Sequence, residues 1–203
     1  MKIDVARFWQ SEFSEHETVE KETRATLAPA FEKLLAVATH CIEQGGKIMF
    51  IGNGGSAADA QHLATELAVR YKTDRAPIAA IALTTDTSAL TAIGNDFGFD
   101  HLFARQVAAL GKKGDVLIGI STSGNSPNVL HALAQAEKQG ITTVGFTGKT
   151  GGKIAPFCNI LLNVPSTTTA RIQEMHITLG QMLCGALEMN LGLVEDKAAR
   201  AAC

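Results

Sequence analysis

The sequence Lys47-Ile-Met-Phe-Ile-Gly-Asn-Gly-Gly-Ser56 passes from a continuous apolar run into a glycine-rich turn, and residues 57–70 have helical composition. The apolar run predicts a buried strand, because a strand covered on both faces is hydrophobic throughout. A glycine turn that leads into a helix is a natural anion site, since free N–H groups and the helix dipole converge there. This stretch therefore predicts a strand–helix unit with an anion-binding loop.

The same alternation continues along the chain and predicts an α/β fold, a doubly wound, five-stranded parallel sheet flanked by helices. The expected strands are 47–52, 78–83, 115–120, 142–147 and 159–164, and the expected helices are 56–71, 87–93, 100–110, 126–139 and 168–190. We expect one domain over 1–203, with an N-terminal helical extension (1–44), a sheet core (45–165) and a C-terminal helix (168–190).

The N-terminal extension is expected to form two helices that serve oligomerisation. Thr26 is a plausible N-cap for the second of them, because its hydroxyl can accept from a free N–H group. Pro29 would then lie in the first turn, where the missing N–H has no helical partner anyway. Gly45-Gly46 is expected to end this helix.

Composition limits the possible partners and location. The chain has 203 residues, 46% of them hydrophobic, and a net charge of −2. No basic patch argues for nucleic acid, and no apolar run approaches the roughly 20 residues that span a membrane. The N-terminus lacks the apolar core of a signal peptide, so a cytoplasmic location is expected. The four cysteines include no CxxC pair, and Cys41, Cys158 and Cys184 are expected to be small core residues.

Polar loops follow three expected strands, at 53–56, 84–86 and 121–126. In a doubly wound sheet ligands bind at the carboxyl ends of the strands, where such loops meet. Ser121-Thr122-Ser123-Gly124-Asn125-Ser126 supplies uncharged hydroxyl and amide donors before a helix, which suits a phosphate monoester. An ordinary Ser/Thr helix cap is the alternative interpretation. The nucleotide-binding pattern GxxxxGK[ST] is absent.

Other polar residues are candidates for catalysis or binding. His62 and Glu66 are four residues apart and share one helix face, so they could be a metal-binding or an acid/base pair. Asn95 and Asp96 could either bind sugar hydroxyls or belong to a helix cap. Gln173, His176 and Gln181 fall within about 140° of one face of the last helix, although a lone histidine there is more often a hydrogen-bonded interior group.

Taken together, GNGGSAADAQH, TAIGNDFG, GDVLIGISTSGNSPN, GFTGKTGGK and ARIQEMH resemble the sugar isomerase (SIS) domain family. More closely, they resemble its phosphoheptose isomerases, from about Phe31 to about Leu193. The resemblance implies a homotetramer with active sites between subunits and one zinc per subunit. It also implies isomerisation of sedoheptulose 7-phosphate to D-glycero-D-manno-heptose 7-phosphate through an enediol, for the heptose of lipopolysaccharide.

The resemblance further implies roles for individual residues. Glu66 matches the catalytic base, with zinc as the Lewis acid. The implied zinc ligands are His62, Glu66, Gln173 and Gln181, the last at the position of the fourth ligand. The implied substrate positions are Asn53, Gly54, Gly55, Glu66, Asn95, Asp96, Ser121, Thr122, Ser123, Ser126 and Gln173.

Gln181 departs from the family pattern, because phosphoheptose isomerases carry a second histidine there as metal ligand and acid/base partner. An amide oxygen can ligate zinc, but an amide cannot exchange protons near neutral pH. Three accounts follow: Gln181 or water completes the zinc site while Glu66 and solvent perform the chemistry; His176 takes over part of the role; or the chain is a non-catalytic relative.

Two other functions are compatible with the same fold. One is a binding protein like the factor that associates with the replication initiator DnaA, which also lacks the late histidine. Glu66 argues against it, because that factor does not keep this carboxylate. The other is a sugar-phosphate-sensing regulator, which the lack of a basic patch disfavours as a direct DNA binder.

Overall fold

The computed structural model describes residues 3–195 of the chain. Strands and helices alternate after a long first helix. In chain order the elements are α1 (Val5–Glu43), β1 (Ile48–Gly52), α2 (Gly55–Ala68), β2 (Ala80–Ala82), α3 (Thr87–Phe97), the 3₁₀ turn η1 (Phe99–His101), α4 (Leu102–Leu110), β3 (Val116–Ile120), α5 (Pro127–Lys138), β4 (Thr142–Gly148), the 3₁₀ turn η2 (Gly152–Phe157), β5 (Ile160–Val164) and α6 (Thr169–Asn190).

The five strands form one parallel sheet in the order β2-β1-β3-β4-β5. Ile48 of β1 pairs with Ala80 of β2 on one side and with Val116 of β3 on the other. The winding of the chain therefore reverses between β1 and β3, and doubly wound sheets bind ligands beyond the carboxyl ends of the strands at such a point. The predicted fold class is confirmed, and the loops after β1 and β3 meet where a ligand is expected.

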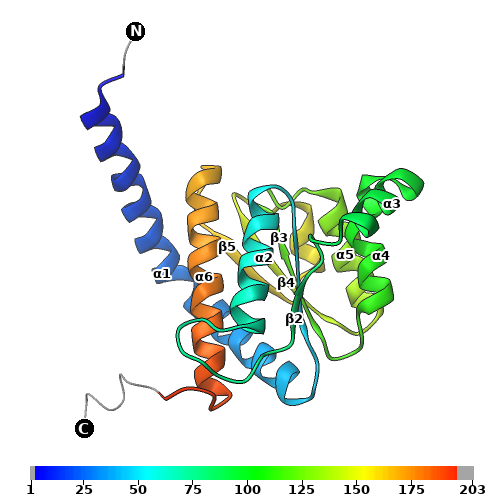
Figure 1. The fold of residues 1–203 in the computed structure, drawn as a ribbon. Coiled ribbons are helices and arrows are strands. Elements are labelled where there is room, and N and C mark those ends of the chain that lie inside the picture. Colours follow the sequence, from blue (N-terminus) through cyan, green and yellow to red (C-terminus); the bar gives the residue numbers. More distant parts are fainter. Residues whose placement is uncertain (1–2, 196–203) are drawn as a thin grey trace.

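Alternate residues of the central strands point to opposite faces of the sheet, so their apolar runs fill two separate cores. Phe50 and Ile118 belong to the core shared with α1, α2 and α6, whereas Ile51 and Leu117 belong to the core shared with α4 and α5. Figure 1 shows the sheet between these two groups of helices. This layering places α2 and α6 side by side on one face.

The prediction of two N-terminal helices was wrong, because α1 is continuous through Pro29. Thr26 does not cap a helix; its hydroxyl donates to the carbonyl of Glu22, 2.8 Å away, within the preceding turn. Pro29 removes one backbone donor, but a stripe of buried side chains holds the helix against the body of the protein and outweighs that loss. The buried residues are Val19, Thr23, Leu27, Leu34, Ala38 and Cys41.

Several expected boundaries differ from the observed ones. α3 runs to Phe97 rather than ending at residue 93, so Asn95 and Asp96 lie in its last turn. Asp86 is the N-cap of α3 and accepts from the backbone N–H of Ala89 at 3.0 Å, which gives the 84–86 loop a structural role. None of the described helices is both long and apolar enough to cross a bilayer.

The described residues do not cover the whole predicted domain, and the three described cysteines differ in burial. Residues 1–2 and 196–203, which the predicted domain includes, lie outside the described residues. Cys41 and Cys184 are buried core residues as expected, whereas Cys158 is only partly buried.

Candidate active site

The loop Ser121–Ser126 joins β3 to α5 at the carboxyl edge of the sheet. The hydroxyl oxygens of Ser121 and Ser126 lie 3.0 Å apart, so the two ends of the loop face each other. Ser126 is the N-cap of α5, yet its side chain makes no capping hydrogen bond with the described residues. The N–H groups of the first turn of α5 can therefore bind an anion. This geometry favours the phosphate interpretation over an ordinary cap.

The middle of this loop is fixed from within and from one neighbouring turn. The hydroxyl of Ser123 accepts from the N–H of Asn125 at 3.2 Å. The side-chain oxygen of Asn125 accepts from the backbone N–H of Lys153 at 3.1 Å, and the carbonyl of Gly124 accepts from Ile154 at 3.0 Å. The loop is thus held in shape before any ligand binds, with Thr122 at its half-buried tip.

Asn53 connects the loop after β1 to the start of α5. Its amide group and that of Asn128 form two reciprocal hydrogen bonds of 2.9 Å each. Asn128 is 1% exposed and Asn53 is half-buried, so the pair bridges the point where the sheet reverses and leaves Asn53 accessible. One N–H of Asn53 remains for a ligand, because the amide nitrogen carries two. Asn128 was missed by the sequence analysis, since nothing local links two residues 75 positions apart.

The glycine turn before α2 lies next to the Gln173 side chain of α6. Gly54 has a φ of +56°, a conformation that favours glycine. A Cβ atom on Gly55 would lie 2.5 Å from the amide nitrogen of Gln173. Glycine at position 55 therefore permits the amide to reach the turn. The structure brings the expected substrate positions Asn53, Gly54, Gly55 and Gln173 together.

His62, Glu66 and Gln181 converge on one atom, the Nε2 of His62. A carboxylate oxygen of Glu66 lies 3.2 Å from it, and the amide nitrogen of Gln181 lies 3.3 Å from it. His62 and Glu66 come from α2, whereas Gln181 comes from α6. The side chains of His62 and Glu66 are 47% and 21% exposed, so a solute can reach the cluster.

The hydrogen-bonding capacity of His62 decides how Gln181 is oriented. An imidazole Nε2 carries either a proton or a lone pair, so it cannot donate to Glu66 and accept from the Gln181 amide at once. A half-turn of that amide places its oxygen against His62 without moving the rest of the side chain. In the metal-free cluster His62 then donates to Glu66, with carboxylate and amide oxygens beside the imidazole; a metal ion bound at the same Nε2 would take the place of that proton.

The spacing of these donors fits a divalent metal ion. Ligand atoms around a tetrahedral zinc with bonds of about 2.1 Å lie about 3.4 Å from each other, close to the 3.2 and 3.3 Å separations at His62. Within the described part of the chain, no group of three or more His, Cys, Asp and Glu residues could hold a metal. Further ligands would have to be amide oxygens or water. Gln181 already lies at His62, whereas Gln173 lies beside Gly55, seven residues before His62 on α2.

His176 cannot take over the role of the missing histidine. It is 0% exposed, its Nε2 donates to the carbonyl of Thr147 at 2.9 Å, and its ring packs on Phe146. Burial lowers the pKa of His176 to about 4, although the hydrogen bond to Thr147 opposes the shift. His176 is therefore a neutral interior group that faces the sheet, whereas Gln181 faces α2.

We expect His176 to make the protein less stable in mild acid. Its pKa is about 4 in the folded chain and about 6.5 in an unfolded one. Between these values the unfolded state binds more protons, so the stabilisation present above pH 6.5 is lost as the pH falls toward 4. The difference at pH 5 is about 2 kcal/mol. Urea unfolding at pH 7.5 and 5 should show a smaller loss in His176→Gln, which cannot titrate; equal losses would contradict the assignment.

Asp59 is a second residue that the sequence analysis missed. It lies three and seven residues before His62 and Glu66, so all three share one side of α2. One of its carboxylate oxygens is buried without a hydrogen-bond partner among the described residues. Burial raises the pKa of Asp59, and the nearby His62 lowers it. The spacing along the helix could have revealed this residue.

The structure does not bring Asn95 and Asp96 to the other candidate residues. Both are exposed at the end of α3, where the Asn95 amide donates to the Asp96 carboxylate at 2.8 Å. None of the described residues of α3 is fully buried. Figure 1 shows α3 at the far side of the molecule from α6. Within one chain these two residues and the His62 cluster are separate.

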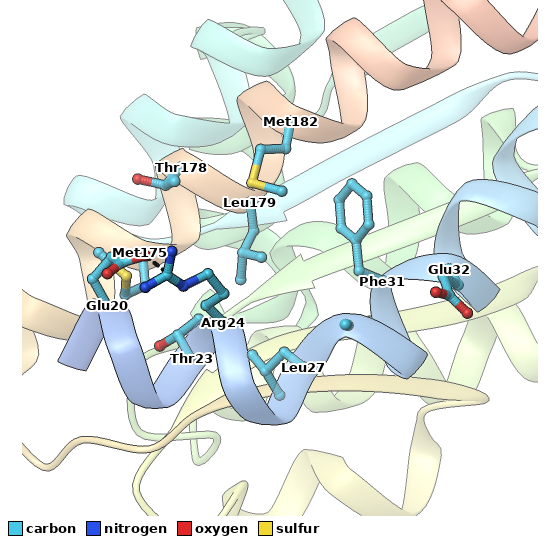
Figure 2. Close-up of a pocket in the computed structure, with 11 residues that line it drawn as sticks. Glu20, Thr23, Arg24, Leu27, Phe31, Glu32, Met175, Thr178, Leu179 and Met182 are labelled. Carbon is cyan, nitrogen blue, oxygen red and sulfur yellow. Dashed lines mark ion pairs between the residues drawn. The ribbon is translucent and has the colours of Figure 1, made fainter. Parts of the chain in front are cut away.

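An apolar groove lies elsewhere, between α1 and α6, and Figure 2 shows its lining. Leu27 and Phe31 of α1 face Met175, Leu179 and Met182 of α6 across it. These α6 residues lie on the opposite side of that helix from Gln173 and Gln181, by the period of about 100° per residue. The groove is therefore distinct from the candidate active site.

Known proteins match this chain over most of its length. The family model described as the SIS domain matches residues 13–148. The phosphoheptose isomerase of Rhodospirillum rubrum is 56% identical over 161 residues, 79% of this chain and 86% of that protein. That of Paramagnetospirillum magneticum is 52% identical over 183 residues, 90% of this chain and 95% of that protein. The solved phosphoheptose isomerase of Neisseria gonorrhoeae has a TM-score of 0.86 and 46% identity, covering 91% of this chain and 99% of that one.

Proposed function

We propose that this chain, which belongs to the SIS domain family and within it to the phosphoheptose isomerases, converts sedoheptulose 7-phosphate to D-glycero-D-manno-heptose 7-phosphate. It is an enzyme of the aldose–ketose isomerase class. The observation that carries the proposed reaction is the convergence of Glu66 and Gln181 on His62, across two helices. A non-catalytic protein has no evident need for an accessible carboxylate held there.

The substrate is bound by its phosphate and by its hydroxyl groups. The loop Ser121–Ser126 takes the phosphate through the hydroxyls of Ser121, Thr122, Ser123 and Ser126 and through the N-terminus of α5. The free N–H of Asn53, the backbone of Gly54 and Gly55 and the Gln173 amide take sugar oxygens. Binding both the phosphate and the hydroxyl groups holds the reacting carbons beside the base, and this positioning lowers the activation barrier.

Glu66 performs the proton transfer. Its carboxylate takes the proton from C1 of the open-chain ketose, and the electron pair of that bond forms the C1=C2 double bond of the enediolate. Glu66 then returns the proton to C2, which leaves the carbonyl at C1. The hydroxyl proton leaves O1 and another is gained by O2 through solvent, because Gln181 cannot exchange protons.

The zinc site is proposed to consist of His62, Glu66, Gln173 and Gln181, with one zinc per subunit. Zinc held by these residues would supply positive charge where negative charge develops on the substrate oxygens. The support is the donor spacing around His62, 3.2 Å to Glu66 and 3.3 Å to Gln181. The chain's own residues hold the base and orient the substrate.

A coupled assay with sedoheptulose 7-phosphate, together with zinc analysis of the same sample, tests the proposal. Turnover with about one zinc per chain is the expected result. If the protein is free of zinc and binds the sugar phosphate without converting it, the proposed isomerase activity is ruled out. That outcome would instead support a non-catalytic binding protein, for which capture of DnaA is the next assay.

Introducing a histidine at position 181 should strengthen the proposed metal site. An imidazole is a better zinc ligand than an amide oxygen and can exchange protons, so Gln181→His should bind zinc at least about tenfold more tightly and turn over faster. Zinc affinity is measured by competition with a chromophoric chelator. Gln10→His, at an exposed position on α1, is the control for an added histidine. Unchanged zinc affinity in Gln181→His would show that residue 181 is not a zinc ligand.

The protein is proposed to form a homotetramer with active sites between subunits. Phe8, Trp9 and Phe13 are 53%, 64% and 51% exposed on the half of α1 that extends away from the body in Figure 1. Apolar surface of this kind is a sign of a protein interface. The apolar groove beside it adds to this surface. Assembly would also let Asn95 and Asp96 serve the site of another subunit.

Light scattering during size exclusion tests the assembly. The wild-type protein should have the mass of four chains, and Trp9→Glu combined with Phe13→Glu should give a smaller species, because two charges cannot be buried at an apolar contact. Thr18→Glu, exposed on the opposite side of α1, should leave the mass unchanged. A monomeric wild-type protein would overturn this part of the proposal.

A further inference from the structure

Arg75 and Glu188 form a buried ion pair between the loop after α2 and the helix α6. The Nε of Arg75 donates to a carboxylate oxygen of Glu188 at 2.7 Å. The two side chains are 0% and 3% exposed. Fully buried arginine is rare, because a charge is removed from water at a high cost unless its partners are well placed. The pair thus marks a place where geometry is strongly specified.

The rest of the Arg75 guanidinium closes the end of α2. It donates to the carbonyls of Glu66 at 2.8 Å, Val69 at 3.2 Å and Ala76 at 3.0 Å. Carbonyls in the last turn of a helix have no partner within the helix, and a cation there also complements the helix dipole. One of these carbonyls belongs to the residue whose side chain is the proposed base.

Glu188 and two glycines of α6 hold α2 and the loop that follows it close to α6. The carboxylate oxygen that pairs with Arg75 also accepts from the backbone N–H of Tyr71 at 3.1 Å. A Cβ on Gly185 would lie 2.9 Å from the Tyr71 ring, and one on Gly180 would lie 2.4 Å from Leu63. α6 therefore touches α2 and its following loop closely on both sides of Gln181, and Figure 1 shows the two helices alongside each other.

We infer that the Arg75–Glu188 pair is a positioning device for the isomerase site. Arg75 fixes the backbone of Glu66, and Glu188 ties Arg75 to the helix that carries Gln181. Together they set the distance across which Glu66 and Gln181 meet at His62. This inference rests on the proposed function, because it assigns the pair to the reaction of Glu66 rather than to stability alone.

Two conservative substitutions test the pair. Arg75→Lys keeps the charge but cannot reach four acceptors, and Glu188→Gln keeps the shape but leaves a buried cation unbalanced. Because a misplacement of about 1 Å can cost 10²-fold in rate, each should lower kcat about 10- to 100-fold. KM should change less than about twofold, since the phosphate loop belongs to β3 and α5 and Gln173 lies at the opposite end of α6 from Glu188.

Asp115→Asn is the matched control. It breaks another ion pair, Lys47–Asp115 at 2.5 Å, in which Asp115 is 3% exposed and Lys47 is 26% exposed. Asp115 precedes β3, at the amino edge of the sheet, and also accepts from the backbone N–H groups of Lys47 and Lys112. We expect this variant to lower the thermal midpoint at least as much as the other two while kcat, measured well below that midpoint, is unchanged.

Cys184 supplies a readout that needs no isomerase activity. It is 0% exposed, and its sulfur lies 3.9 Å from the Leu63 carbonyl at the contact between α2 and α6. Loosening this contact should expose the thiol through local opening. Alkylation of Cys184, followed by peptide mass spectrometry, should be at least about tenfold faster in Arg75→Lys and Glu188→Gln than in wild type. Arg75→Lys is the decisive variant because it keeps its charge, whereas loss of the Glu188 charge by itself removes one cause of the raised pKa of Cys184. In Asp115→Asn the faster thiol should instead be Cys41, which lies beside Asp115.

The two readouts separate the outcomes. Faster Cys184 alkylation with lower kcat in both pair variants, and neither in Asp115→Asn, supports the inference. Faster alkylation with normal kcat overturns it, because the contact would then serve stability alone. Normal alkylation also overturns it. If the wild-type protein shows no turnover, the proposed function fails, and Cys184 still decides whether the pair holds α2 on α6.

Discussion

Replacing Glu66 by glutamine should lower kcat about 10³-fold, the size expected for removal of a general base. The amide has the shape of the carboxylate and can still accept a hydrogen bond from His62, so the fold and the 3.2 Å contact should be retained. An amide cannot take the C1 proton at neutral pH. The coupled assay measures the loss, and circular dichroism confirms the fold.

Two controls show whether a loss of kcat in Glu66→Gln comes from loss of the base. Glu137→Gln makes the same chemical change at an exposed position of α5 and should leave kcat unchanged. Zinc is measured in the same sample, because Glu66 is also a proposed ligand; a variant that keeps zinc but loses turnover isolates the role as base. Turnover within tenfold of wild type would falsify the assignment of Glu66.

Features that depend on local sequence were predicted well. The strand Val116–Ile120 was expected at 115–120, because a strand buried on both faces must be apolar throughout. The helical spacing of His62 and Glu66 correctly predicted that their side chains meet. In both cases the physical cause lies within a few residues of chain, where periodicity is informative.

Features that depend on tertiary contacts were not predicted. α1 continues through Pro29 because its buried side packs on the rest of the protein, which the proline alone does not reveal. Asn128 is distant in sequence from its partner Asn53. Periodicity placed Gln173, His176 and Gln181 on one broad face of the last helix. In the structure, however, His176 contacts the sheet and Gln181 contacts α2. A helix that packs on two elements divides its polar residues in a way that only the packing decides.

The phosphate loop provides the second large expected effect, in Gly124→Ala. Gly124 has a φ of +65°, and a Cβ there would lie 2.0 Å from the carbonyl oxygen of Gly151. The left-handed conformation costs an alanine about 1–2 kcal/mol, and relieving the overlap costs a further 1–3 kcal/mol or so. Because the atoms in the way are backbone, the loop and the 151–152 turn must separate.

Separation of the loop should weaken phosphate binding as well as the fold. The hydrogen bond from Ile154 to the Gly124 carbonyl, 3.0 Å long, would be strained first, so KM for the sugar phosphate should rise at least about tenfold. Gly45→Ala is the control for the cost of the left-handed backbone conformation alone. Gly45 has a φ of +75°, and a Cβ there would have no neighbouring heavy atom within 4 Å among the described residues. Urea unfolding and KM are measured for both. If Gly124→Ala were no worse than Gly45→Ala in both measurements, the loop would not need its contact with the 151–152 turn, and Ser121–Ser126 would lose its place as the preformed phosphate site.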